Sequence, residues 1–186
     1  MIQHMRDGMG RLLELFRNGP YLLKATLCQI PRQMWRYRPR PYRPSIHEMV
    51  VELAESEAGI YVMSRQRIAQ SDNPLSELAS QSRPRSPVYF DQTVLESLKI
   101  ISYLRRSTYR LLCNLPDHCW DYTVVHPRDG SITLRQWLVI QERHIPMSVQ
   151  SMWGNHDTWI RMHPIKKTHV KSSLGSESSP ESLGVK

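Results

Sequence analysis

Cysteine, glycine and long apolar runs are scarce in this chain of 186 residues, and each scarcity excludes a class of protein. The three cysteines are odd in number and show no CxxC spacing, which argues against a disulfide framework and a zinc knuckle. No apolar run approaches the ~20 residues that a membrane-spanning helix needs. There is no glycine-rich phosphate loop, no GxSxG and no HExxH motif. We therefore expect a reduced, cytoplasmic protein that is not embedded in a membrane.

Positive charge, by contrast, is abundant. The net charge is +8 and the sequence pI is near 9.7. Residues 32–43 concentrate it, because five arginines alternate there with three aromatic residues: Arg32, Arg36, Arg38, Arg40 and Arg43 with Trp35, Tyr37 and Tyr42. Such a segment could hold single-stranded nucleic acid by phosphate pairing and base stacking. The favoured alternative is a proline-punctuated connector with solvated arginines and packed aromatics, since no recognised nucleic-acid motif accompanies the charge.

Helical periodicity dominates the rest of the chain and predicts four long helices. The first covers about 3–29, with Gly19-Pro20 expected to kink or split it. The second opens at a capping box, Ser45 to Glu48, and ends near residue 70. The third begins at an Asp91 cap and ends near residue 115. The fourth starts at a second capping box, Thr133 to Gln136, bends at Pro146 and ends before Pro164.

These elements predict an all-α fold, a four-helix bundle formed by residues 1–164. The long connectors before and after the second helix favour a topology other than minimal up-and-down hairpins. Residues 116–130 are expected to be extended, with a turn at Asp129-Gly130. Residues 165–186 are rich in Ser, Gly and Lys without periodicity, which predicts a disordered tail. Six methionines are expected to fill gaps in the core: Met9, Met34, Met49, Met63, Met147 and Met152.

The order of several short motifs resembles the DinB-like (DinB/YfiT) superfamily of four-helix bundles, many of them described as putative metal-dependent enzymes. The stretches that carry the resemblance are Gly19-Pro20, Pro44-Ser45-Ile46 before Glu52 to Glu57, Leu115-Pro116 with Trp120, Gly130 to Leu134, and His144 to Ser148. Together they span most of the ordered chain. Arg43 stands where the family often has tryptophan.

The resemblance implies a site for a divalent metal held by three histidines, one on the second helix and two on the fourth. Carried over position by position, these ligands fall on Glu52, His144 and Ser148. A carboxylate and an imidazole are legitimate ligands, but an alcohol binds metal poorly. His47, His126 and His156 are the side chains that could add a ligand. The favoured interpretation is metal-free, with Glu52 and His144 forming a buried or half-buried ion pair between the helices.

Three functions follow from these patterns. The first is a metal-poor or metal-free binding or structural module with no cofactor, expected to dimerise as the family commonly does. The second is a metal-dependent hydrolase or thiol transferase that uses an unusual Glu52/His144 site with nickel, zinc or manganese. The third is a nucleic-acid-associated protein that acts through residues 32–43. A cysteine–histidine dyad at His118-Cys119 is disfavoured, because adjacent side chains rarely face each other.

Overall fold

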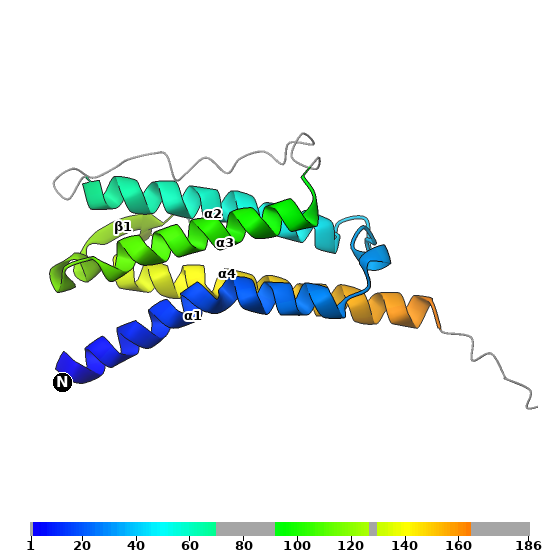
Figure 1. Ribbon diagram of the computed structural model, residues 1–186, viewed down its shortest axis with the longest axis horizontal. Helices are drawn as coiled ribbons and strands as arrows, with labels where there is room; N and C mark the ends of the chain where they lie inside the picture. Colours follow the sequence, from blue (N-terminus) through cyan, green and yellow to red (C-terminus); the bar gives the residue numbers. More distant parts are fainter. Residues whose placement is uncertain (1, 70–91, 127–129, 165–186) are drawn as a thin grey trace, which may run out of the picture.

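The computed structural model describes residues 2–69, 92–126 and 130–164. Its main elements are four helices, α1 (Ile2–Gln29), α2 (Ile46–Ala69), α3 (Val94–Cys113) and α4 (Leu134–Met162). Between them lie the short 3-10 helices η1 (Arg32–Met34) and η3 (Asp117–Asp121) and the strands β1 (Thr123–His126) and β2 (Gly130–Thr133). The predicted all-α four-helix bundle is therefore confirmed (Figure 1). The predicted disordered tail at 165–186 lies outside the described residues.

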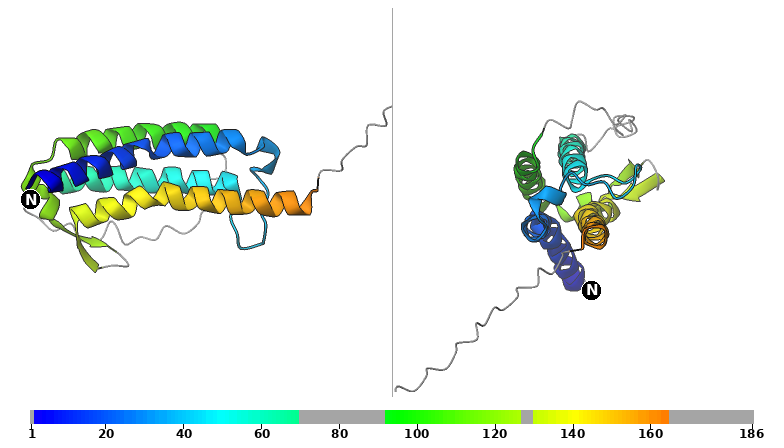
Figure 2. Two further views of the ribbon diagram at one scale, coloured as in Figure 1. Left: turned by 90° about the horizontal axis from the view of Figure 1, so that it is seen from below. Right: turned by 90° about the vertical axis from the view of Figure 1, so that its right-hand side faces the viewer.

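The helices run in two parallel pairs, which is not the simple up-and-down order. α2 and α3 run in one direction, and α1 and α4 run in the other (Figures 1 and 2). Hydrogen bonds fix the relative positions: His47 Nε2 at the start of α2 lies 2.8 Å from the carbonyl oxygen of Gln92, just before α3. The expectation of a topology other than minimal hairpins is confirmed. As a result, the starts of α2 and α3 share one end of the bundle with the ends of α1 and α4.

The helix starts follow the predicted capping chemistry, with one correction. The backbone N–H of Ser45 donates to Glu48 Oε2 over 2.8 Å, and Thr133 and Gln136 form the second expected capping box. The third helix is capped by Thr93, whose hydroxyl accepts from the Glu96 amide, so the Asp91 prediction is wrong. The signal was present in the sequence, because Thr93 and Glu96 have the S/T-x-x-E spacing.

The connector before α4 contains more structure than expected. It begins with η3 and continues into an antiparallel hairpin in which Thr123 pairs with Thr133 and His126 with Gly130. Gly130 has φ of 71°, a conformation that glycine adopts without steric cost. The extended backbone predicted for 116–130 is present at 123–126, but residues 117–121 form η3 instead. The pairing was not predicted, because four-residue strands carry little periodic signal. Asp129 of the predicted turn lies outside the described residues.

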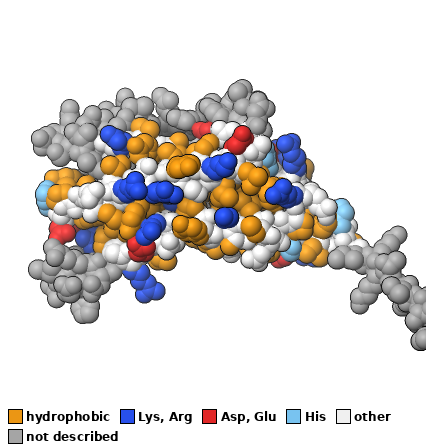
Figure 3. All heavy atoms as spheres, in the orientation of Figure 1, with side chains coloured by type: hydrophobic (Ala, Val, Ile, Leu, Met, Phe, Trp, Pro, Cys, Tyr) orange, Lys and Arg blue, Asp and Glu red, His pale blue; other side chains and the backbone are white. Residues whose placement is uncertain are grey.

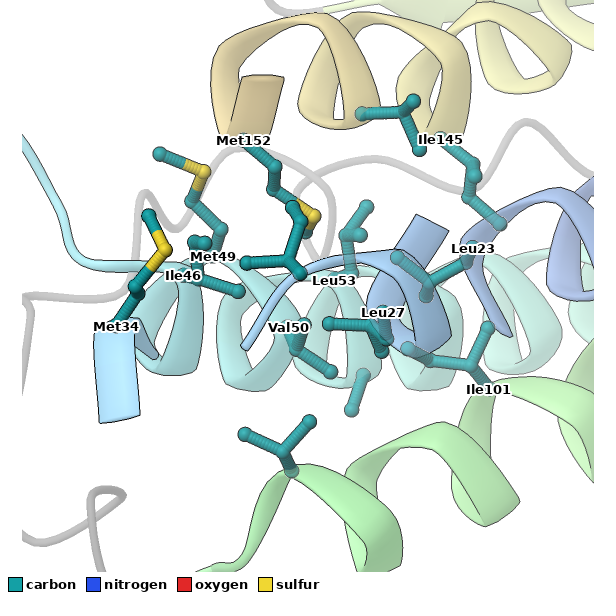
Figure 4. Close-up of a cluster of buried hydrophobic side chains, with 14 residues drawn as sticks. Leu23, Leu27, Met34, Ile46, Met49, Val50, Leu53, Ile101, Ile145 and Met152 are labelled. Carbon is teal, nitrogen blue, oxygen red and sulfur yellow. The ribbon is translucent and has the colours of Figure 1, made fainter. Parts of the chain in front are cut away.

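The core consists of two apolar clusters stacked along the bundle. One includes Leu23, Val50, Ile101, Ile145 and Met152 (Figure 4), and the other includes Phe16, Leu112, Trp120, Trp137 and Leu138. Of the six methionines expected in the core, Met34, Met49 and Met152 are buried and Met9 and Met63 are packed against the second cluster. Met147 is 63% exposed, so its assignment to the core is wrong. Within the described residues, no helix is both long and apolar enough to cross a membrane.

Candidate functional site

The three positions that the family resemblance implied as metal ligands lie along the contact between α2 and α4. Ser56 Oγ on α2 is 3.5 Å from His144 Nδ1 on α4, and Asn155 Nδ2 donates to the Pro44 carbonyl over 2.9 Å. These contacts show that the two helices run antiparallel. Four residues back from Ser56 is Glu52, and four residues on from His144 is Ser148. All three positions therefore face the same stretch of the α2–α4 contact.

The chemistry of this stretch does not fit a catalytic metal. Glu52 is exposed, whereas His144 and Ser148 are half-buried. A catalytic metal usually has three good protein ligands and one open position. Here the implied set has one carboxylate, one imidazole and one alcohol, and the hydroxyl of Ser56 faces the imidazole. In the part of the chain that the structure describes, no group of three His, Cys, Asp or Glu side chains could hold a metal ion.

Of the further histidines proposed as helpers, His47 is buried and its ring bonds the Gln92 carbonyl at the start of α3. His156 lies 3.2 Å from Asp157 and edge-on to Trp153, with ring centroids 5.1 Å apart. The side chain of His126 lies outside the described residues. None of these contacts brings His47 or His156 next to Glu52 or His144.

A buried ion pair links two of the helices, and it is distinct from the Glu52–His144 pair expected from the sequence. Glu52 is exposed and His144 is half-buried, and a pair between them stays a prediction. The buried pair is Glu57, fully buried, with Arg105 of α3, which is 1% exposed; Arg105 Nε donates to Glu57 Oε1 over 2.8 Å. It separates the two apolar clusters. This pair was not predicted, because no sequence pattern connects two residues 48 positions apart.

Arg105 also reaches the two remaining helices. Its Nη1 donates to the carbonyl of Phe16 in α1 over 2.8 Å, and its Nη2 donates to the carbonyl of Gln141 in α4 over 2.9 Å. The guanidinium carbon lies 4.2 Å from the centre of the Phe16 ring, within cation–π distance. One side chain thus bonds α1, α2 and α4 from α3. All three guanidinium nitrogens donate a hydrogen bond, an arrangement that the single ammonium group of lysine could not reproduce.

The Gly19-Pro20 motif of α1 makes room for this guanidinium. Proline has no N–H, so Pro20 leaves the carbonyl four residues earlier, that of Phe16, without its helical donor. Arg105 supplies a donor to that carbonyl. A Cβ at Gly19 would stand 2.6 Å from Arg105 Nη1. The helix continues through Pro20, and Figure 1 shows its first half inclined away from its second, so the predicted kink is present without a split.

Burial sets the protonation behaviour of the pair. Desolvation raises the pKa of Glu57 above its usual value, and the nearby Arg105 opposes that shift only in part. The same desolvation lowers the pKa of Arg105, again opposed by Glu57. Glu57 Oε2, Thr108 Oγ1 and Gln141 Oε1 are buried acceptors without a hydrogen-bond partner among the described residues. Buried polar atoms of this kind are costly, so this layer is held by the four-helix scaffold around it.

A cavity of about 270 Å³ opens beside Glu52, under the segment that joins α1 to α2. It is lined by Arg38, Pro41, Tyr42, Arg43, Pro44, Glu48 and Glu52. Arg38 forms an ion pair with Glu48 across it. Arg43 therefore lies beside Glu52, one of the implied ligand positions. It occupies the position at which the family often has tryptophan.

A larger cavity, of about 450 Å³, lies at the opposite end of the bundle. Its floor is apolar and includes Leu13, Leu112 and Trp120, and its rim includes Cys113 and His118. The three cysteines are free thiols. Trp137 is buried, while Tyr61 and Trp153 are half-buried.

Comparison with known proteins agrees with this fold. The sequence matches no protein-family model and no curated protein. Among solved structures, it is similar to YfiT from Bacillus subtilis, described as a probable metal-dependent hydrolase with an unusual four-helix bundle topology. The TM-score is 0.68 at 16% sequence identity, over 82% of this chain and 86% of that one. The fold implied by the sequence resemblance is thereby confirmed: the chain is a four-helix bundle with the architecture of YfiT.

Proposed function

We propose that this protein is a metal-poor or metal-free binding or structural module built on the YfiT-type bundle. The observation that supports it is the polar layer of the core, formed by the buried Glu57–Arg105 pair with the Phe16 and Gln141 carbonyls that Arg105 bonds. A single guanidinium bonds the other three helices, and therefore the bundle has a polar link between its helices that requires no metal. The implied ligand positions point the same way, since a serine occupies one of them and the carboxylate at another is exposed.

A metal-dependent hydrolase or thiol transferase is the second candidate. Two observations favour it. YfiT is described as a probable metal-dependent hydrolase, and His144 lies 3.5 Å from Ser56, which is four residues from Glu52 on α2. A bound nickel, zinc or manganese ion would supply a Lewis acid and an activated water or thiol. In that case Glu52 and His144 would be the residues that hold it.

Elemental analysis of protein purified without a histidine tag separates the two candidates. The proposal expects nickel, zinc and manganese well below one equivalent, and no change in the Glu52→Ala and His144→Ala variants. Near-stoichiometric metal that is lost in both variants would overturn the proposal and favour the enzyme. A matched control is Glu55→Ala, which removes a carboxylate from the same helix at a position outside the implied ligand set.

The Ser148→His variant tests the alignment of the implied ligands itself. If α2 and α4 keep the family geometry, restoring the imidazole should raise zinc affinity well above that of the natural protein. Gln150→His adds a histidine at an exposed position of the same helix and serves as the control. Equal affinities in the two variants would contradict the assignment of Ser148 as a ligand position.

We also propose that the protein forms a homodimer, as the resemblance implies, and that its setting is cytoplasmic, as the cysteine usage indicates. Sedimentation velocity at several protein concentrations measures the oligomeric state. A monomer at every concentration would contradict it.

A further inference from the structure

The segment between α1 and α2 presents its arginines to solvent in a regular pattern. Trp35, Tyr37 and Pro39 are half-buried against the bundle, while the intervening Arg36, Arg38 and Arg40 are exposed. Arg32 and Arg43, at the two ends of the segment, are exposed as well. From Trp35 to Arg40, residues that pack on the bundle therefore alternate with residues that carry charge.

The backbone of this basic segment, residues 32–43, is fixed by specific bonds. Trp35 Nε1 donates to the Ile30 carbonyl over 3.2 Å, and the His47 amide donates to the Trp35 carbonyl over 2.8 Å. Beyond its end, the Pro44 carbonyl accepts from Asn155 of α4. The Tyr37 ring lies edge-on to His163, with centroids 6.3 Å apart. The cations are therefore presented by an ordered backbone, which lowers the entropic cost of binding a ligand.

The charge of this segment is largely uncompensated. Arg38 is paired with Glu48, and Arg32 lies over the Trp35 ring at 5.7 Å. For Arg36, Arg40 and Arg43, no ion pair with an acidic residue is found within the described part of the chain. Figure 3 shows a face on which Lys and Arg side chains far outnumber Asp and Glu, in keeping with the net charge of +8. A polyanion is the partner that this arrangement fits.

One aromatic side chain in the segment is held out in solvent. Tyr42 is 96% exposed. It follows Pro41 and lines the 270 Å³ cavity together with Pro44. The favoured sequence interpretation, in which all three aromatics pack on the bundle, is thus wrong for Tyr42, although Trp35 and Tyr37 do pack. An exposed ring among guanidinium groups is the combination that binds unpaired bases, because every base has a face that can stack.

We propose that the basic segment binds single-stranded nucleic acid, with Arg36, Arg40 and Arg43 contacting phosphates and Tyr42 stacking on a base. The exposed side chains of the segment favour this polyanion over an anionic membrane, since none of them is aliphatic and available for insertion. This site does not involve the implied metal positions, so it goes beyond the proposed function and stands or fails separately.

Fluorescence anisotropy with a labelled oligothymidylate of 12 nucleotides, titrated at several salt concentrations, tests the proposal. The triple variant Arg36→Gln/Arg40→Gln/Arg43→Gln should weaken binding at least about 10-fold and reduce the salt slope by about 2, since each phosphate contact on a single strand contributes about 0.7. The control Arg106→Gln/Arg110→Gln/Arg143→Gln removes the same charge from exposed positions of α3 and α4 and should change the Kd less than about 3-fold. Equal weakening in both variants would overturn the proposal.

Tyr42 supplies a second, independent readout. Tyr42→Ala should weaken binding by about 5- to 100-fold, the range for loss of one base stack, and Tyr42→Trp should restore it. Because the side chain is exposed, these variants should fold normally, which circular dichroism verifies. No detectable binding at low salt would overturn the proposal. So would tighter binding to vesicles of anionic phospholipid than to the oligonucleotide with the same dependence on the arginines, or binding to duplex DNA that does not depend on Tyr42.

Discussion

Gly19 of α1 lies directly against the guanidinium of Arg105 in α3, so closely that a Cβ on Gly19 would stand 2.6 Å from Nη1 and 3.0 Å from Ile145 Cδ1. The end of an arginine usually moves aside at little cost. Arg105 cannot do so easily, because bonds to Phe16, Glu57 and Gln141 hold it on three sides. The absence of a side chain at position 19 is thus a requirement of the polar layer.

Gly19→Ala should therefore destabilise the protein by about 1–3 kcal/mol, the range for overpacking in a tight core. Gly154→Ala is the matched control: this glycine lies in the interior of α4 and has nothing within 4 Å of its would-be Cβ. It should stabilise by about 0.5–1 kcal/mol, because alanine favours the helix. Urea unfolding measures both changes. A neutral Gly19→Ala would mean that Arg105 has room to move.

Removing one member of the buried ion pair should cost more than removing both. Arg105→Met leaves the Glu57 carboxylate buried without its partner, and we expect a loss of about 3–5 kcal/mol. The double variant Glu57→Leu/Arg105→Met replaces the pair with apolar side chains and should lose markedly less. Chemical denaturation of the two single variants and the double variant completes the cycle.

Arg110→Met provides the control for this cycle, since it removes an exposed arginine from the same helix and should change stability by less than about 0.5 kcal/mol. If the double variant lost as much as the sum of the single variants, Glu57 and Arg105 would not be coupled.

The pH dependence of stability should carry the signature of Glu57. Its pKa is raised in the folded state by burial, so between the usual value of 4.5 and the raised value the folded protein holds more protons than the unfolded chain. Stability contributed by this group is then fully present below pH 4.5 and is lost as the pH rises through the raised pKa. The difference in unfolding free energy between the natural protein and Glu57→Gln should fall over that range. A difference that grows with pH would show the opposite shift.

Tyr109 should ionise above the usual pH range of a tyrosine. Its hydroxyl donates to Glu14 Oε1 over 2.7 Å, and this bond, followed by one to Cys113, raises the pKa of Tyr109 to about 12. Subtracting the alkaline absorbance titration of Tyr109→Phe from that of the natural protein isolates this group. Glu14→Gln should bring its midpoint back toward 10.0. A midpoint unchanged by Glu14→Gln would place the cause elsewhere.

Much of the fold could be predicted from the sequence because its signals are local. Helical periodicity and the Ser45 and Thr133 capping boxes lie within single elements, and they placed the helix ends within a few residues. The misses have physical reasons. Asp91 was assigned as the cap because aspartate often caps helices, whereas Thr93 forms the cap. Met147 was assigned to the core as a gap-filling methionine, but it lies on the exposed side of α4.

The polar layer could not be predicted in the same way. Arg105 follows the spacing of the inner face of α3, four residues after Ile101, but arginine usually faces solvent and its partners here come from three other helices. Gly19-Pro20 predicted a kink, but the role of that kink depends on Arg105, 86 positions after Gly19. Glu52, His144 and Ser148 were placed on facing helices by the resemblance. Whether they bind a metal stays a prediction.

The parallel alignment of α2 with α3 also has an electrostatic consequence. Each helix has a macrodipole whose positive pole lies at its N-terminus, so two positive poles adjoin at one end of the bundle, next to the negative poles of α1 and α4. Glu48 and Glu96 occupy the first turns of α2 and α3, and Arg161 lies in the last turn of α4. Each charge thus sits at the pole that attracts it. Added salt should weaken the attractions of the exposed Glu96 and Arg161 more than that of Glu48, which is buried.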